Sequence, residues 1–188
     1  MLTYILTLIT VDLFTKVIIF FNFMDLNFSF LNGNFGFNPF INRDQMSIFN
    51  SLFNLGISTN KLIIINVVTL ILLCLLYARI KAVFGIDKHT TVIFILFISA
   101  SICSIIDKLL LGGSLDYLLI FRWICDLKDI YLYLGFLYLV IYLVKNVDSS
   151  SSFKDDIKKV KKLFQLNNNL NYSRIIKNEL LSLEIQAF

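Results

Sequence analysis

Four apolar runs of membrane-spanning length constrain the fold of this chain more than any other feature of its sequence. They cover residues 1–23, 62–83, 90–111 and 129–145. A helix needs about 20 apolar residues to cross the ~30 Å hydrocarbon core of a bilayer, and each run is close to that length. The 188 residues are 57% hydrophobic and only 16% charged, which excludes an ordinary soluble domain. The sequence therefore predicts an all-α polytopic membrane protein with four transmembrane helices.

The segments between and after these runs predict a membrane domain followed by a tail. Residues 1–146 form the predicted four-span domain. In its first loop, residues 26–31 alternate apolar and polar side chains as a strand does, residues 32–40 are rich in turn residues, and residues 44–56 group apolar side chains on one helical face. We therefore expect a small β-element and an interfacial helix there. Residues 147–188 are polar and basic, which fits either an amphipathic helix on an anionic membrane surface or a solvated tail.

The distribution of Lys and Arg predicts the orientation of the four runs. With four spans, residues 84–89 and the tail share one side of the membrane. Eleven Lys and Arg residues fall on that side and four on the other, and basic residues collect on the cytoplasmic side of membrane proteins. We therefore expect both termini in the cytoplasm, and residues 24–61 and 112–128 outside it. The first run lacks a basic leader segment and carries Asp12 and Lys16 in its middle, so we expect a span rather than a cleaved signal peptide.

Charged residues inside or beside the apolar runs are the candidates for function, since a charge in hydrocarbon costs roughly 2.5–3.5 kcal/mol. Asp12 and Lys16 are four residues apart in the first run and can pair on one helical face. Gly112 and Gly113 let the chain leave helical geometry after the third run, so that Asp116 can turn back over the helices. The full set comprises Asp12, Lys16, Asp107, Lys108, Asp116, Asp126 and Asp129.

Asp116 and Asp129 are the pair that best fits a reaction. Two carboxylates that face each other across a wet cavity share one proton, which leaves one of them as a base that can activate water. This is the chemistry of aspartic proteases. The residues that other catalytic sites need are missing: the sequence has one His, three widely spaced Cys, no metal-ligand spacing and no phosphate-binding glycine loop. We expect no metal and no cofactor. Taken alone, each Asp also fits an ordinary loop or helix N-terminus.

Four segments resemble the motifs of one family, in the same order along the chain. "VDLFTK" (11–16) resembles its first motif, an Asp followed four residues later by Lys, and "NFG" (34–36) resembles its Asn-x-Gly element. "SIIDKLLLGGSLDY" (104–117) resembles its Asn-x-x-Asp-Arg stretch with a downstream Val-Val-Asp-Phe, and "CDLKDIYLYLG" (125–135) resembles its Phe-Asn-x-Ala-Asp. The family is lipoprotein signal peptidase, or signal peptidase II. The resemblance covers residues 1 to about 146.

The resemblance implies a four-span aspartic endopeptidase of the bacterial inner membrane. Such enzymes cut the signal peptide from a prolipoprotein just before its diacylglyceryl-modified Cys. Carried over by position, Asp116 and Asp129 would be the catalytic pair near the extracytoplasmic face. We further expect no cofactor or metal, no nucleic-acid partner, contact with membrane lipid, and a monomer. The supporting or substrate-contacting residues would be Asp12, Lys16, Asn34, Gly36, Ser104, Asp107, Lys108 and Asp126.

The chain departs from the family's motifs at four positions. Lys108 replaces an Arg and loses its planar fork of donors, and Ser104 replaces an Asn. Asp126 replaces an Asn and Lys128 an Ala, so Asp126 can either perturb the catalytic pair or bind Lys128. A non-catalytic relative of the family therefore stays open. So do a structural partner in a membrane complex and a small transporter or ion-coupling subunit, whose carboxylates would line a transverse path. Carboxyl groups of Asp116 and Asp129 about one water apart would favour the enzyme.

Overall fold

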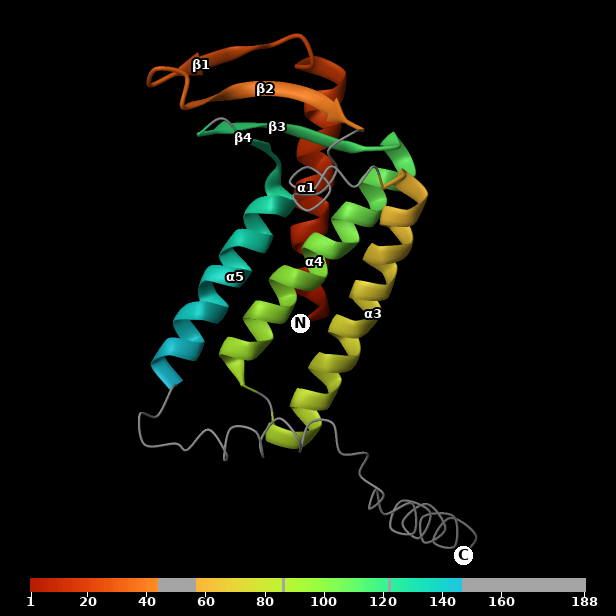
Figure 1. Cartoon of the computed structure of the whole chain (residues 1–188), viewed down its shortest axis with the longest axis vertical. Coiled ribbons are helices and arrows are strands. Elements are labelled where there is room, and N and C mark those ends of the chain that lie inside the picture. The colour runs from red at the N-terminus through yellow and green to blue at the C-terminus, as the bar shows by residue number, and fades with distance from the viewer. Residues whose placement is uncertain (44–56, 86, 122, 147–188) are drawn as a thin grey trace, which may run out of the picture. The chain divides into compact units, whose positions relative to one another are not determined.

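The computed structural model of this chain describes residues 1–43, 57–85, 87–121 and 123–146. In these residues it contains four helices that are long and apolar enough to cross a membrane. They are α1 (Leu2–Asn22), α3 (Thr59–Phe84), α4 (Lys88–Leu111) and α5 (Leu127–Asn146) (Figure 1). The four long apolar helices are confirmed. The interfacial helix expected at 44–56 and the tail at 147–188 lie outside the described residues, and the domain boundary stays a prediction.

The helix α4 is the central helix, because α1, α3 and α5 each pack against it. Apolar residues of α4 and α1 form the core between the helices, with Phe94, Ile95 and Ile98 packing against Ile5. The Asp87 side chain caps the start of α4 by accepting a hydrogen bond from the Thr90 N–H at 2.9 Å. Many large apolar side chains on the outer faces of the helices are exposed, as they are in helices that contact lipid.

A four-stranded antiparallel sheet lies at the end of the helices where α1 and α4 end and α5 begins (Figure 1). The strands are β1 (Phe28–Phe30), β2 (Phe35–Asn42), β3 (Ser114–Ile120) and β4 (Trp123–Cys125), in that order across the sheet. The small β-element is therefore confirmed near residues 26–31. It is larger than expected, however, because residues 35–42 form a strand where turns were expected and residues 114–125 add two strands.

Two local features explain how β2 and β3 pair. Pro39 cannot donate a hydrogen bond to a sheet, and it lies where the register of β2 against β3 shifts, between Phe37 and Phe40. Gly112 ends α4 in the left-handed conformation with φ of 64°. At Gly113 a Cβ atom would come within 2.5 Å of the Asn42 carbonyl oxygen, so only glycine allows this close approach of the strands. The expected change of direction at these glycines is confirmed.

Candidate active site

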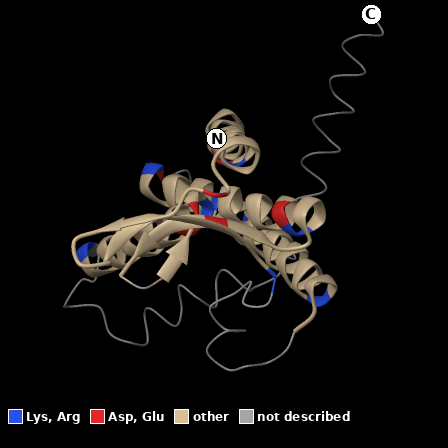
Figure 2. Cartoon of the chain, turned by 90° about the horizontal axis from the view of Figure 1, so that it is seen from above, with Lys and Arg blue, Asp and Glu red and all other residues tan. Residues whose placement is uncertain are grey.

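Buried acidic and basic side chains meet where the sheet covers the ends of the helices; ribbon segments that carry such residues, red and blue, lie near the centre of Figure 2. They come from α1, α4, β3 and the start of α5, which are far apart in the sequence. Asp12 and Asp126 are fully buried, and the other members except Asp129 are at most 5% exposed. We call this set the carboxylate cluster, and it consists of Asp12, Lys16, Asp107, Asp116, Asp126, Lys128 and Asp129.

The Lys16 side chain joins α1 to the rest of the cluster. Its Nζ lies 2.8 Å from Asp12 Oδ2, one helical turn away. It also lies 2.7 Å from Asp107 Oδ2 on α4 and 2.7 Å from Asp126 Oδ2 before α5. The pair of Asp12 with Lys16 expected from the sequence is therefore present, and it extends to two further carboxylates. Such a buried ammonium offsets the repulsion between carboxylates that burial would otherwise make costly.

Asp116 lies on β3 and is fixed by two neutral donors. Asn42 Nδ2 on β2 donates to Asp116 Oδ2 at 2.9 Å, and Ser114 Oγ donates to Asp116 Oδ1 at 2.8 Å. Ser114 and Asp116 share one face of the strand, because side chains alternate along it. Burial raises the pKa of Asp116, although Lys128 and the Asn42 amide oppose the shift. This carboxyl group therefore retains its proton to a higher pH than an exposed Asp does.

Asp126 and Asp129 cap the first turn of α5 in a reciprocal way. The Asp129 N–H donates to Asp126 Oδ1 at 3.2 Å, and the Asp126 N–H donates to Asp129 Oδ2 at 3.3 Å. This is the arrangement of a capping box. The Asp129 side chain is 33% exposed, which makes it the one member of the cluster that water reaches readily. Burial would raise the pKa of Asp126, but the ammonium groups of Lys128 and Lys16 outweigh burial and lower it.

The carboxylates of Asp116, Asp126 and Asp129 offer oxygen atoms that all lie within 4.8 Å of one another. Asp116 and Asp129 are therefore about one water molecule apart, as a pair that activates water requires. Three carboxylates at this spacing also suit a metal ion. The ammonium of Lys128 already lies among them, 3.9 Å from Asp116 Oδ1 and from Asp129 Oδ1. We therefore assign no metal-binding role to these residues.

Lys128 is the residue whose place in the site the sequence did not determine. Its Nζ forms a very short hydrogen bond to Asp126 Oδ2, lies 2.6 Å from Ser114 Oγ and lies 3.3 Å from Asp107 Oδ2. Asp126 therefore binds Lys128 as one of the two options expected, and its carboxylate also lies close enough to Asp116 and Asp129 for the other, an effect on the pair. Ser114 and Asn42 were also missed as members of the site. The position of Ser114, two residues before Asp116 on a strand, could have identified it, whereas Asn42 has no local signal.

Several residues that the sequence proposed lie outside the cluster. Asn34 is exposed in the turn between β1 and β2, and its carbonyl accepts a hydrogen bond from Phe121 N–H at 2.7 Å. Gly36 pairs with Ser29 and Leu119 within the sheet. At about 3.3 Å per residue, Asn34 lies roughly 16 Å from Asp116 along the strands. The structure therefore does not bring Asn34 and Gly36 to the cluster, and Asn42 supplies the amide instead.

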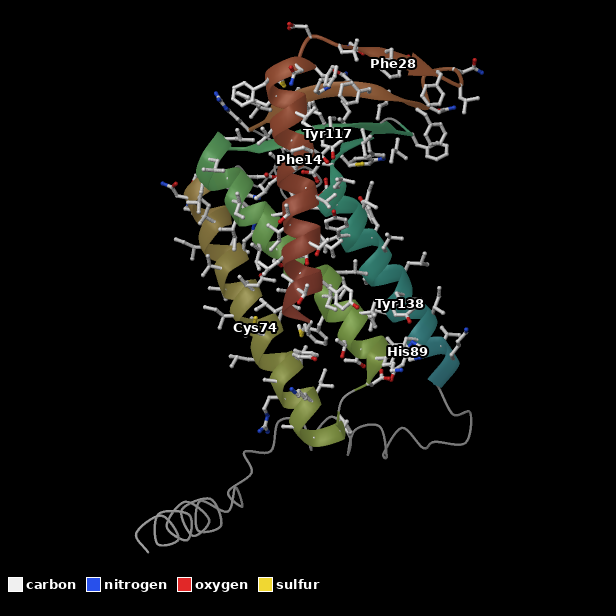
Figure 3. The ribbon with its side chains drawn as sticks, turned by 180° about the vertical axis from the view of Figure 1, so that it is seen from behind. Phe14, Phe28, Cys74, His89, Tyr117 and Tyr138 are labelled. Atoms are coloured by element: carbon white, nitrogen blue, oxygen red, sulfur yellow. The ribbon has the colours of Figure 1, made fainter. Side chains whose placement is uncertain are left out.

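Ser104 and Lys108 form a smaller group on α4 beside the cluster. Ser104 Oγ accepts hydrogen bonds from Lys108 Nζ at 2.7 Å and from Asn66 Nδ2 of α3 at 2.9 Å. Lys108 is 4% exposed and forms no ion pair among the residues that the structure describes. Figure 3 shows Phe28 in the sheet, and it shows His89 and Tyr138 together at the opposite end of the helices.

An apolar cavity of about 180 Å³ opens beside the cluster between α1 and the end of α4. Its wall is formed by large apolar side chains together with two charged residues of the cluster, Lys16 and Asp107. The apolar residues are Leu13, Val17, Phe20, Phe21, Leu110, Leu111 and Leu115. An apolar chain in this cavity would therefore lie directly beside the buried charges.

Comparisons with known proteins identify a family and a similar fold. A family model described as signal peptidase (SPase) II, of the peptidase A8 type, matches residues 4–145. A 2.3 Å structure described as a bacterial membrane enzyme has a TM-score of 0.62 and 18% identity, covering 80% of this chain and 91% of that one. A second one, at 1.9 Å, has a TM-score of 0.59 and 18% identity, covering 78% and 93%. No curated protein sequence matches the chain.

Proposed function

The chain belongs to the signal peptidase II family, and from this premise we propose that it cuts prolipoproteins just before the diacylglyceryl-modified Cys with Asp116 and Asp129 as its catalytic pair. Family membership makes the chain a protease of a bacterial membrane family that processes lipoproteins. One observation carries the assignment of the residues. Asp116 and Asp129 come from a strand and a helix, and yet their carboxylate oxygens lie within 4.8 Å of each other.

The environments of the two carboxyl groups suggest different roles. Asp116 is 4% exposed, and burial favours its neutral form, so we assign it the acid. Asp129 is a third exposed and can reach water, so we assign it the base. Asp129 would take a proton from water while the oxygen of that water attacks the scissile carbonyl carbon. Asp116 would give its proton to the carbonyl oxygen as the tetrahedral gem-diol forms. Asp129 would then give its proton to the amide nitrogen, the C–N bond would break, and a gem-diol hydroxyl would return a proton to Asp116 as the new carboxyl group forms.

The neighbouring features suit a lipid-modified peptide. The apolar cavity between α1 and α4 would receive an apolar part of the substrate beside the cluster. Lys108 is buried without a carboxylate partner in the described residues, so its ammonium would bind a carbonyl oxygen of the substrate. Four helices able to span a membrane would hold the enzyme in the bilayer where such substrates are anchored. We keep the inner membrane, the extracytoplasmic site and the monomeric state as parts of this proposal.

A second candidate is a non-catalytic member of the same family, and Lys128 is the observation that favours it. Its ammonium lies 3.9 Å from both carboxylates of the proposed pair and could hold both in the ionised form. A Ser–Lys hydrolase is a poorer fit to the contact between Ser114 and Lys128, because Asp126 and Asp107 favour the ammonium, which cannot accept the proton of Ser114. A transporter is also a poorer fit, since the carboxylates gather at one end of the helices.

The proposal is tested by incubating the purified protein with a diacylglyceryl-modified peptide that carries a prolipoprotein cleavage site. Mass spectrometry should detect one cut, on the N-terminal side of the modified Cys. Asp116→Asn and Asp129→Asn should each lose at least about 10²-fold in rate, since an amide cannot act as an acid or base. Asp25→Asn, at an exposed position, is the matched control. Cleavage at another bond, or undiminished cleavage by either Asn variant, would contradict the proposal, and no cleavage by the folded wild type would favour the non-catalytic relative.

A further inference from the structure

Asp126 and Lys128 form a buried pair at the start of α5, in contact with the proposed catalytic carboxylates. Residues two apart do not face each other on a regular helix. Asp126 precedes the first helical residue, however, and its side chain turns back over the first turn of α5, where Oδ1 caps Asp129 N–H. The other oxygen, Oδ2, binds Lys128 Nζ and also lies 2.7 Å from Lys16 Nζ. With Asp126 fully buried and Lys128 5% exposed, neither charge has water as an alternative partner.

Lys128 is the one cation paired with the proposed catalytic carboxylates among the described residues. Asp116 and Asp129 have no other ion-pair partner there, and each lies 3.9 Å from Lys128 Nζ. Lys128 Nζ hydrogen-bonds to Asp126 Oδ2 and to Ser114 Oγ, and at 3.3 Å it lies closer to Asp107 Oδ2 than to Asp116 or Asp129. Lys128 therefore acts on the pair through its charge and not through a hydrogen bond. The charged groups around it are Lys16, Asp107, Lys108, Asp116, Asp126 and Asp129.

We propose that Lys128, held in place by Asp126, is a positioning residue that sets the protonation range of the pair of Asp116 and Asp129. This inference rests on the proposed function. Two neighbouring carboxylates hold a shared proton because their charges repel, and a cation equidistant from both reduces that repulsion. The shared proton is consequently lost at a lower pH when Lys128 is present. Asp126 has the opposite sign, so the two residues offset each other and act as one unit on the pair.

The test measures the protonation of Asp129 without relying on catalysis. Carbodiimides modify protonated carboxyl groups, and Asp129 is the exposed member of the cluster, so mass spectrometry can follow its modification as a function of pH. Lys128→Met keeps the length of the side chain and removes its charge. At 3.9 Å the lost attraction should move the midpoint of modification up by at least about one pH unit. Lys128→Arg should keep the wild-type midpoint, and Lys61→Met, at an exposed position, is the control.

Removing the partner gives a change of opposite sign. Asp126→Asn should move the midpoint for Asp129 to lower pH, because it removes a neighbouring negative charge. The double variant Asp126→Asn with Lys128→Met removes both charges and should return to within about half a pH unit of the wild type. It removes one positive and one negative charge together, so the net charge of the cluster stays that of the wild type. If Lys128→Met alone does not fold, Asp126→Asn and the double variant decide the question.

The outcomes separate this inference from the proposed function. The pH profile of cleavage should shift in parallel with the midpoints, whereas a purely structural role would lower the rate at every pH without moving the profile. Unchanged midpoints in Asp126→Asn and Lys128→Met would overturn the inference even if the wild type cuts its substrate. If the midpoints shift in the variants and the wild type cuts nothing, the charge role of Lys128 would be supported and the proposed function contradicted.

Discussion

Asp116 illustrates how a single carboxyl group depends on residues that are distant in the sequence. Asn42 and Ser114 donate to its two oxygens, while Lys128 lies 3.9 Å from one of them. The sequence predicted its return towards Asp129 from Gly112 and Gly113. It could not predict Asn42, because that contact depends on the pairing of β2 with β3 over 74 residues. Local spacing identifies i,i+4 pairs such as Asp12 and Lys16, and long-range pairing selects the other partners.

The raised pKa of Asp116 predicts a pH-dependent contribution to stability. Burial is its largest cause, and an unfolded Asp has a pKa of about 3.9. When the folded-state pKa lies above that value, the group's contribution to stability is complete at pH values below the unfolded pKa. This contribution is lost as the pH rises through the raised pKa. Asp116→Asn carries no charge to lose. We therefore expect the melting temperature of Asp116→Asn to rise relative to that of the wild type as the pH increases from about 4.

The measurement is thermal unfolding in detergent at a series of pH values. For a chain of this size, 1 kcal/mol corresponds to roughly 2–4 °C. Asp25→Asn provides the matched control, because Asp25 is exposed and its replacement should leave the same difference at every pH. A constant difference between Asp116→Asn and the wild type would show that the folded-state pKa of Asp116 is not raised.

At the scale of elements, the helices could be predicted closely and the sheet only in part. Each apolar run carries its own signal, so the predicted spans lie within a few residues of α1, α3, α4 and α5. The strands β3 and β4 carry no clear alternation, since the residues of "LDYLLI" (115–120) are mostly apolar on both faces. The strand β3 takes its conformation from pairing with β2, and β4 from pairing with β3. A segment that depends on a distant partner in this way has no reliable local pattern.

Gly113 is the residue on which the pairing of β2 with β3 depends most directly. A Cβ atom there would lie 2.5 Å from the Asn42 carbonyl oxygen, and backbone atoms cannot move aside as a side chain does. We expect Gly113→Ala to lower the free energy of unfolding by about 1–3 kcal/mol. It should also displace Asn42 from Asp116 and lower the cleavage rate.

Gly112→Asn provides the comparison for Gly113→Ala. Gly112 has φ of 64° with open space around it, and Asn adopts the left-handed conformation more readily than other side chains. This variant should therefore melt close to the wild type. Equal stability of Gly113→Ala and the wild type in chemical denaturation would mean that β2 and β3 are not packed as closely as described.

At the scale of the whole molecule, the described helices alternate in direction. Helices α1 and α4 end beside the sheet, whereas α3 and α5 begin there (Figure 1). The residues that precede α4 and those at the end of α5 consequently lie at the end opposite to the sheet. Lys81, Lys88 and Lys145 lie at that opposite end. At the sheet end, Lys128 is buried in an ion pair and offers no charge to the membrane surface. The excess of basic residues at the end opposite to the sheet is therefore larger than the count of Lys and Arg in the sequence implies, because that count includes Lys128 at the sheet end.

This alternation predicts that the sheet faces outward and the start of α4 faces the cytoplasm. Single Cys residues placed at Asn32 and at Lys88, both exposed, distinguish the two ends in a background where the exposed Cys74 is replaced by Ser. A membrane-impermeant maleimide should label Asn32→Cys on intact spheroplasts, and it should label Lys88→Cys only after the membrane is opened. This result is expected because basic residues are retained on the cytoplasmic side. The opposite labelling pattern would place the sheet, and with it the carboxylate cluster, in the cytoplasmic half. Labelling of both positions from the same side would contradict an odd number of spans between them and with it the four-span arrangement.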